Sequence, residues 1–182
     1  WSPDGRSIGF FADGKLKTIS TSGGPPQVLC DIGPAVSSGG TWSRGGVILF
    51  SPAPLAAPLK RVLATGGDCV PITNPEPGMS HRFPEFLPDG NHFFYRADFG
   101  VEAKRGVYLA SLDRPTEPRL VLRDESSIAF APSLRGSSGH MLFIRNQTLM
   151  AQRFDTRTLQ LDGEPMRLAE HASFSVTGIT PQ

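Results

Sequence analysis

Charge of one sign and long hydrophobic runs are both scarce in this sequence. Its 18 Lys and Arg residues are nearly balanced by 17 Asp and Glu residues, for a formal net charge of +1. Binding to nucleic acid needs a clustered basic face, so we expect no nucleic-acid partner. The longest mainly apolar run, residues 47–59, is interrupted by prolines and is shorter than the about 20 residues that a membrane-spanning helix needs. We therefore expect no membrane span.

Cysteine is also rare. The only two, Cys30 and Cys69, are too few for a disulfide framework or a structural zinc site. They fall in the outer strands expected for two neighbouring repeats, at different positions within those strands. We therefore predict two free thiols.

The common catalytic and cofactor-binding motifs are absent. The sequence has no Gly-x-Ser-x-Gly nucleophile motif, no phosphate-binding loop ending in Lys-Ser or Lys-Thr, and no His-Glu-x-x-His zinc motif. We therefore predict that the chain is not an enzyme, has no catalytic residues, and holds no metal or cofactor.

A sustained hydrophobic period of 3.6 residues is missing too, so we expect almost no helix. Instead, short apolar runs alternate with turn residues among 20 glycines and 17 prolines. This alternation is typical of an all-β protein.

One segment recurs along the chain. The N-terminal Trp-Ser-Pro-Asp-Gly-Arg-Ser-Ile returns as Trp42-Ser-Arg-Gly-Gly-Val, as Phe86-Leu-Pro-Asp-Gly-Asn-His-Phe and, in eroded form, as Gly139-His-Met. In the intact copies, proline and glycine suit a chain reversal, and the aspartate is expected to accept backbone hydrogen bonds within the turn.

The spacing of these copies predicts the architecture. The first apolar residue after each turn is Ile8, Val47, Phe93 or Met141, which gives steps of 39, 46 and 48 residues. Repeats of this length, built from short strands and turns, are the mark of β-propeller blades.

We predict an all-β fold, a β-propeller of four-stranded antiparallel blades, with about four blades present as part of a larger propeller. The approximate blades are residues 1–38, 39–79, 80–126 and 127–171, and residues 172–177 are predicted to be the inner strand of a following blade. Blade edges are left unpaired in this scheme. Because unpaired edges recruit partners, we also predict association into a homo-oligomer.

Several segments resemble TolB-type, WD-repeat-like bacterial propellers. They are Trp1-Ser-Pro-Asp-Gly, Ser22-Gly-Gly-Pro-Pro, Ser80-His-Arg-Phe-Pro-Glu-Phe-Leu-Pro-Asp-Gly and Gly106-Val-Tyr-Leu-Ala-Ser-Leu-Asp. The likeness covers almost the whole chain and is greatest to propeller regions linked to bacterial serine/threonine kinases. It implies the sensor or interaction region of a larger protein, in an extracytoplasmic or periplasmic location. Kinase chemistry is not implied, since the phosphoryl-transfer motifs are absent.

Three polar residues stand out on the predicted innermost strand of the third blade. Alternate residues of such a strand can face the central channel, where His81, Arg82 and Glu85 would bind an anionic or polar ligand. The alternative is that these side chains bond to neighbouring strands and fix the order of the blades. Glu85 is the only carboxylate expected on the inner strands, which is poor material for acid–base catalysis.

The function predicted from these features is a non-catalytic module that binds a protein partner or a small polar ligand. Its binding face would consist of residues 31–38, 52–58, 73–80 and 97–105, because these loops gather at one end of the propeller. One alternative is the gating or substrate-binding propeller of a hydrolase or peptidase. Another is a purely structural part of a closed ring.

Overall fold

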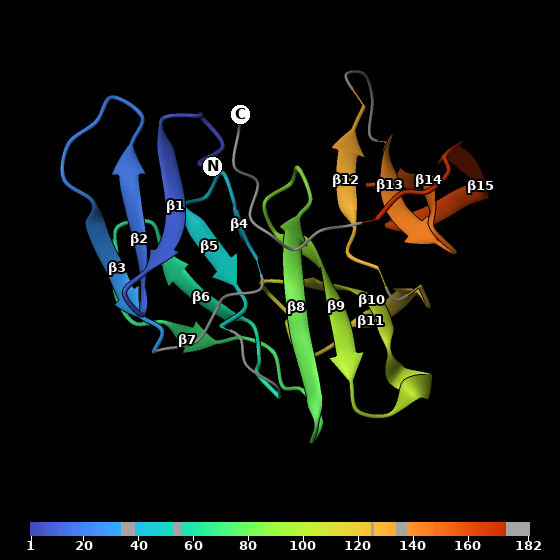
Figure 1. Ribbon diagram of the computed structural model, residues 1–182, viewed down its shortest axis with the longest axis horizontal. Helices are drawn as coiled ribbons and strands as arrows, with labels where there is room; N and C mark the ends of the chain where they lie inside the picture. Colours follow the sequence, from blue (N-terminus) through green and yellow to red (C-terminus); the bar gives the residue numbers. More distant parts are fainter. Residues whose placement is uncertain (34–38, 53–55, 125, 134–137, 174–182) are drawn as a thin grey trace.

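The computed structural model describes residues 1–33, 39–52, 56–124, 126–133 and 138–173, and its regular structure is almost entirely antiparallel β (Figure 1). Within these ranges the only helical element is the 3-10 turn η1 (Glu102–Lys104). The prediction of an all-β propeller with almost no helix is confirmed. None of the described helical structure is long or apolar enough to cross a bilayer.

The strands form four separate sheets in chain order, which are the blades (Figure 1). The first sheet has three strands, β1 (Ser7–Ala12), β2 (Lys15–Ser20) and β3 (Gln27–Asp31). The second has β4 (Gly40–Trp42), β5 (Val47–Phe50), β6 (Lys60–Leu63) and β7 (Val70–Pro71). The third has β8 (Met79–Phe86), β9 (His92–Phe99), β10 (Gly106–Ser111) and β11 (Arg119–Leu122). The fourth has β12 (Ala129–Pro132), β13 (Ser138–Arg145), β14 (Thr148–Asp155) and β15 (Gln160–Ala169).

The aspartates of the repeated turn act as predicted. The Asp4 carboxylate accepts the backbone N–H of Arg6 at 3.0 Å and the Ser2 hydroxyl at 2.7 Å. The Asp89 carboxylate accepts the N–H groups of Asn91 and His92, each at 2.9 Å. These bonds satisfy turn donors that no strand partner reaches, so the Pro-Asp-Gly pattern specifies the reversal locally.

The hydrophobic core lies between the blades. Successive residues of a strand point to opposite faces of its sheet, so β9 supplies Phe93 and Tyr95 to the core shared with the second blade and Phe94 to the core shared with the fourth. Phe93, Phe94 and Tyr95 are all at most 2% exposed. The third blade is therefore stabilised by its neighbours on both sides.

The two cysteines form a disulfide, so the prediction of free thiols is wrong. Cys30 in β3 bonds to Cys69, which precedes β7, across Cα atoms 6.0 Å apart. We predicted free thiols because the two cysteines fall at different positions within the expected outer strands. The two blades are offset, however, so that residues 64–69 lie alongside β3. In this contact the N–H of Gly67 donates to the carbonyl of Leu29 at 3.2 Å.

Parts of two predicted features lie outside the described residues. They are residues 34–38 and 53–55 of the predicted binding face, and residues 174–177 of the predicted inner strand of a following blade. Within the described part, the N–H of Ala172 donates to the carbonyl of Gln147 at 2.8 Å. The blade boundaries and the membership of a larger propeller stay predictions.

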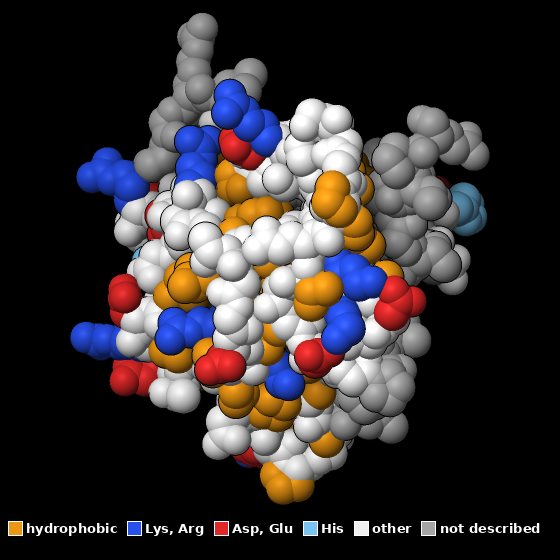
Figure 2. All heavy atoms as spheres, turned by 90° about the vertical axis from the view of Figure 1, so that its left-hand side faces the viewer, with side chains coloured by type: hydrophobic (Ala, Val, Ile, Leu, Met, Phe, Trp, Pro, Cys, Tyr) orange, Lys and Arg blue, Asp and Glu red, His pale blue; other side chains and the backbone are white. Residues whose placement is uncertain are grey.

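Figure 2 shows the side of the molecule formed by the first two blades. Lys and Arg side chains are interspersed there with Asp, Glu and hydrophobic side chains rather than gathered into one basic patch (Figure 2). Exposed hydrophobic residues of these blades' outer strands are Val28, Leu63 and Val70.

Candidate functional site

Strand β8 carries all three residues predicted to bind a ligand, but a bulge divides it. Arg82 pairs with Arg96 on β9, whereas Glu85 pairs with Phe94, so β8 has one more residue than β9 in this stretch. Phe83 takes a φ of +52°, and Pro84 has no N–H to offer the ladder. The bulge therefore changes which face of the sheet the following residues occupy.

As a result, His81 and Glu85 belong to opposite faces of the blade. His81 stands opposite Ala97, which packs in the core shared with the second blade. Glu85 stands opposite Phe94, which packs in the core shared with the fourth blade. The sequence suggested one polar cluster, and the structure separates it.

His81 lies inside the core between blades two and three. It is 6% exposed, and its ring centroid is 4.6 Å from that of Tyr95. Its Nδ1 atom has no hydrogen-bond partner. Burial lowers the pKa of this imidazole to about 4, so it is neutral at pH 7.

Arg82 lies near the middle of β8, just before the bulge. Its guanidinium is 4.0 Å from the carboxylate of the buried Asp98, which also pairs with Arg96 at 2.5 Å. The same guanidinium lies over the rings of Phe83 and Phe99, at 5.8 and 5.6 Å from their centroids. These contacts match the alternative role considered for Arg82, in which it bonds to a neighbouring strand.

Glu85 instead lines an open cleft at the end of the propeller where the inner strands turn into the second strands. The cleft has a volume of about 320 Å³ and is formed by β4 and the turn after it, by β8 and its turn, and by β12. Besides Glu85, its lining includes Trp42, Arg44, Phe86 and Phe130. Pro3 of the first blade lines it as well, so all four blades contribute to one concave surface.

The Glu85 carboxyl is held between two blades. It accepts the backbone N–H of Phe130 on β12, and no Lys, Arg or His of the described residues forms an ion pair with it. Burial raises the pKa of this carboxyl to about 7, while the hydrogen bond from Phe130 acts weakly in the other direction. Glu85 thus gains and loses its proton near neutral pH.

In the second blade, Thr41 occupies the position that Glu85 occupies in the third. Thr41 precedes Trp42 as Glu85 precedes Phe86, and the Thr41 hydroxyl accepts the N–H of Phe86 at 3.2 Å. Both residues therefore connect the inner strand of one blade to that of the next. Since a hydroxyl makes this connection between blades two and three, a carboxyl is not required for it between blades three and four.

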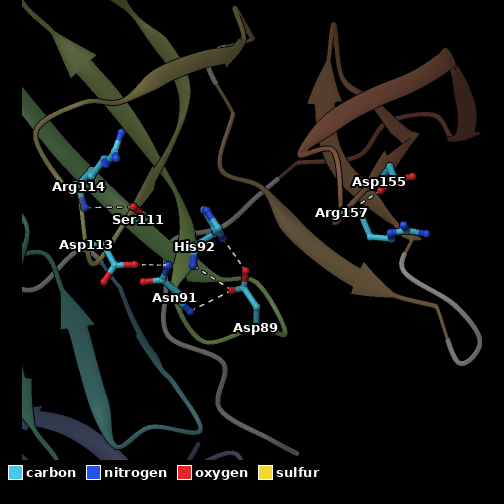
Figure 3. A network of polar contacts seen from close by, with 8 residues as sticks. All are labelled: Asp89, Asn91, His92, Ser111, Asp113, Arg114, Asp155 and Arg157. Carbon is cyan, nitrogen blue, oxygen red and sulfur yellow. Dashed lines mark hydrogen bonds and ion pairs between the residues drawn. The ribbon is translucent and has the colours of Figure 1, made fainter.

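Hydrogen bonds stiffen the rim of the cleft. Pro88 and Gly90 line it, and between them Asp89 binds the His92 ring at 2.5 Å as well as the backbone (Figure 3). The Asn91 side-chain amide donates to Asp113 at 2.9 Å, which joins this turn to the chain after β10 (Figure 3). The rim is thus preformed rather than assembled on binding.

Trp42, Arg44 and Phe130 line the cleft but were not predicted as site residues. Arg44 had one available signal, because it stands where the first and third copies of the turn have Pro3 and Pro88. The cleft also lies at the opposite end of the propeller from the predicted loop face. In the part of the chain that the structure describes, no three His, Cys, Asp or Glu side chains gather to hold a metal ion.

No protein-family model matches this sequence, and no curated protein matches it either. Solved structures do match its fold. A putative TolB from Agrobacterium tumefaciens has a TM-score of 0.66 at 20% identity, over 93% of this chain and 60% of that one. An oligogalacturonate lyase in complex with manganese has a TM-score of 0.61 at 16% identity, over 89% of this chain and 44% of that one. A prolyl endopeptidase has a TM-score of 0.60 at 12% identity, over 92% of this chain and 27% of that one.

These similarities show the propeller fold, including its likeness to TolB, but not an activity. The chain spans about 27–60% of the length of these three structures. The prediction that the chain is not an enzyme, made from the absence of catalytic motifs, is contradicted, because a lyase and an endopeptidase contain the same fold and the fold alone does not decide between the two. The absence of familiar motifs was too weak a reason, since catalytic groups in propellers need not follow a short sequence pattern.

Proposed function

We propose that this chain is the ligand-binding part of a β-propeller protein and that it binds a small polar ligand in the cleft around Glu85. One observation carries the proposal: a mostly buried carboxyl lines a preformed cleft without an ion-pair partner among the described residues. Burying such a group costs free energy unless a partner compensates it. A bound ligand would supply that partner.

The wider roles considered from the sequence are proposals of the same kind. A sensor region linked to a kinase is supported only by the resemblance of the repeated segments to such propellers. The alternative, a substrate-binding or gating propeller of a peptidase, is supported by the shared fold of a prolyl endopeptidase. A ligand in the Glu85 cleft is compatible with both. His81 and Arg82 contribute to it through the shape of β8 rather than by lining the cleft.

The chain offers a convenient test, because Trp42 lines the cleft and the only other tryptophan is Trp1. In a Trp1→Phe background, fluorescence therefore reports on Trp42 alone. We would titrate this variant with a library of small cationic, anionic, neutral and zwitterionic compounds. We expect at least one class to change the fluorescence saturably and to raise the Tm.

The test variant is Glu85→Gln, which keeps an acceptor for the Phe130 N–H and removes the charge, so binding in the cleft should weaken. The matched control is Glu117→Gln, an exposed change on the outer part of the third blade, which should leave binding unchanged. If no compound of the library binds, or if every binder ignores Glu85→Gln, the proposed site is wrong.

A further inference from the structure

The cleft lining contains two side chains of opposite charge, and no other described residue forms an ion pair with either. Glu85 lies in its wall, and Arg44 lies on the turn after β4. Neither side chain forms an ion pair with another described residue, and they do not pair with each other. All other charged side chains are missing from the cleft lining. A ligand that forms an ion pair with each of them must carry both signs of charge.

We propose that the cleft binds a zwitterion of amino-acid or dipeptide size, with its ammonium group on Glu85 and its carboxylate on Arg44. This inference rests on the proposed function, since it names the ligand class of the same site. A guanidinium matches a carboxylate by two parallel hydrogen bonds. A carboxylate that accepts one backbone N–H keeps lone pairs for an ammonium donor.

The remaining lining fits the rest of such a ligand. Trp42, Phe86 and Phe130 present aromatic rings, which bind apolar side chains and also attract ammonium groups. The volume of about 320 Å³ lies at the lower end of small-molecule sites, which span roughly 300–1,000 Å³. A divalent metal fits less well, because Ca²⁺ and Mg²⁺ need several oxygen ligands and Glu85 is the only carboxylate in the lining.

Binding by this arrangement depends on pH. An ammonium group pairs with Glu85 only when the carboxyl is ionised. The other charged residue of the cleft lining is Arg44, and Asp4 lines the adjoining hollow, while β9 and β12 face Glu85 with Phe94 and with the backbone of Phe130. Since the pKa of Glu85 is about 7, affinity should rise about tenfold between pH 6 and pH 8. Glu85→Gln should abolish this rise.

Three probes of one shape separate the charges: L-phenylalanine has both, phenethylamine has the ammonium group, and 3-phenylpropionate has the carboxylate. We would titrate each into the Trp1→Phe protein and its Glu85→Gln and Arg44→Gln derivatives. L-phenylalanine should bind most tightly. Glu85→Gln should lower the affinity for L-phenylalanine and phenethylamine about tenfold or more. Arg44→Gln should lower the affinity for L-phenylalanine and 3-phenylpropionate by a similar factor. The dipeptide L-phenylalanyl-L-phenylalanine distinguishes a peptide from a free amino acid.

The outcomes separate the ligand class from the site. If library compounds bind at Glu85 but L-phenylalanine and the dipeptide bind no better than the single-charge probes, the zwitterion is wrong and the proposed function stands. If Ca²⁺ or Mn²⁺ binds instead and Glu85→Gln abolishes it, the site takes metal and the zwitterion is again wrong. If nothing in the library binds, both proposals fail.

Discussion

At the scale of single residues, burial moves the two titratable groups of β8 in opposite directions. Desolvation penalises the charged form of each group, so the pKa of His81 falls to about 4 and that of Glu85 rises to about 7. Both groups are therefore mainly uncharged in the folded protein at mildly acidic pH. Their effects on stability have opposite signs and overlap between about pH 4.5 and pH 6.5, so single variants are needed to see them.

For Glu85, the folded state holds its proton more tightly than the unfolded state does, because the pKa rises from 4.5 to about 7. This group's contribution to stability is complete below about pH 4.5 and is lost as pH rises to about 7. The loss corresponds to about 3 kcal/mol. Glu85→Gln should therefore gain free energy of unfolding relative to the wild type between pH 5 and pH 8, measured by urea denaturation. Glu117→Gln is the control, and an equal pH dependence in wild type and Glu85→Gln would contradict the buried carboxyl.

For His81, the unfolded state holds the proton more tightly, because folding lowers the pKa from 6.5 to about 4. Its contribution to stability is complete above about pH 6.5 and is lost as pH falls to about 4, by about 3 kcal/mol. His81→Leu should remove this loss, so the variant should become more stable relative to wild type as the pH falls from 7 to 4.5. The exposed change His140→Gln should not. If the free energy of unfolding changed with pH in the same way in wild type and His81→Leu, the prediction would be wrong, and the imidazole could be protonated in the folded protein.

At the scale of elements, inner and outer strands are joined differently from blade to blade. Hydrogen bonds between described residues join neighbouring inner strands, from Phe86 to Thr41 and from Phe130 to Glu85. The outer strands of the first two blades are joined by the disulfide and by the hydrogen bond from Gly67 to Leu29. The covalent link thus holds the part of the first blade that lies farthest from the cleft.

Removing this link should destabilise the protein. The disulfide joins residues 39 positions apart, and closing a loop of this length in the unfolded chain is worth about 4 kcal/mol. We expect the Cys30→Ala/Cys69→Ala protein to unfold at a lower urea concentration than the oxidised wild type. Adding dithiothreitol should lower the stability of the wild type and leave that of the double variant unchanged. Equal midpoints for all four samples would show that the disulfide does not form.

At the scale of the whole molecule, the first sheet differs from the others. It has three strands, and β1 pairs with β2 while no described strand pairs with its other edge. In the other sheets the equivalent strand, β5, β9 or β13, is paired on both sides. Unpaired strand edges recruit other strands, so association through β1 stays our prediction.

Light scattering at several protein concentrations tests this prediction. We expect a mass above that of one chain, rising with concentration, and we expect deletion of residues 171–182 to lower the mass or the stability. A monomer at every concentration, unchanged by the deletion, would contradict it. The Cys30→Ala/Cys69→Ala protein under the same conditions excludes intermolecular disulfides as the cause of a higher mass.

Local chemistry accounts for what could be predicted of the fold. The turns at Asp4 and Asp89 are specified by residues within a few positions of each other, because the carboxylate bonds to the backbone that immediately follows. The Asp13-Gly14 hairpin is similar, with φ of +54° and +68° as such two-residue turns require. Strands between such turns, repeated at blade spacing, lead to a propeller without reference to distant contacts.

The candidate site could be predicted only in part. Glu85 was singled out because it lies on an inner strand, and it does line the cleft. His81 was grouped with it because alternation along an unbroken strand would put residues 81 and 85 on one face, and Arg82 only because it lies on the same inner strand. Pro84, which cannot donate to the ladder, was the available sign of a bulge, but a proline does not by itself tell how many residues the bulge contains.

The secondary structure, the turns and the repeat follow from the amino-acid order alone, because they depend on interactions between neighbouring residues. The disulfide, the opposite environments of His81 and Glu85, and the end of the propeller where the cleft lies become evident only in the folded chain. The separation of His81 from Glu85 depends on the bulge in β8. The disulfide and the cleft depend on how one blade sits against the next, which is set by the packing of large side chains such as Phe93, Phe94 and Phe130 between sheets. Such packing joins residues about 40 positions apart, and no local pattern encodes that distance.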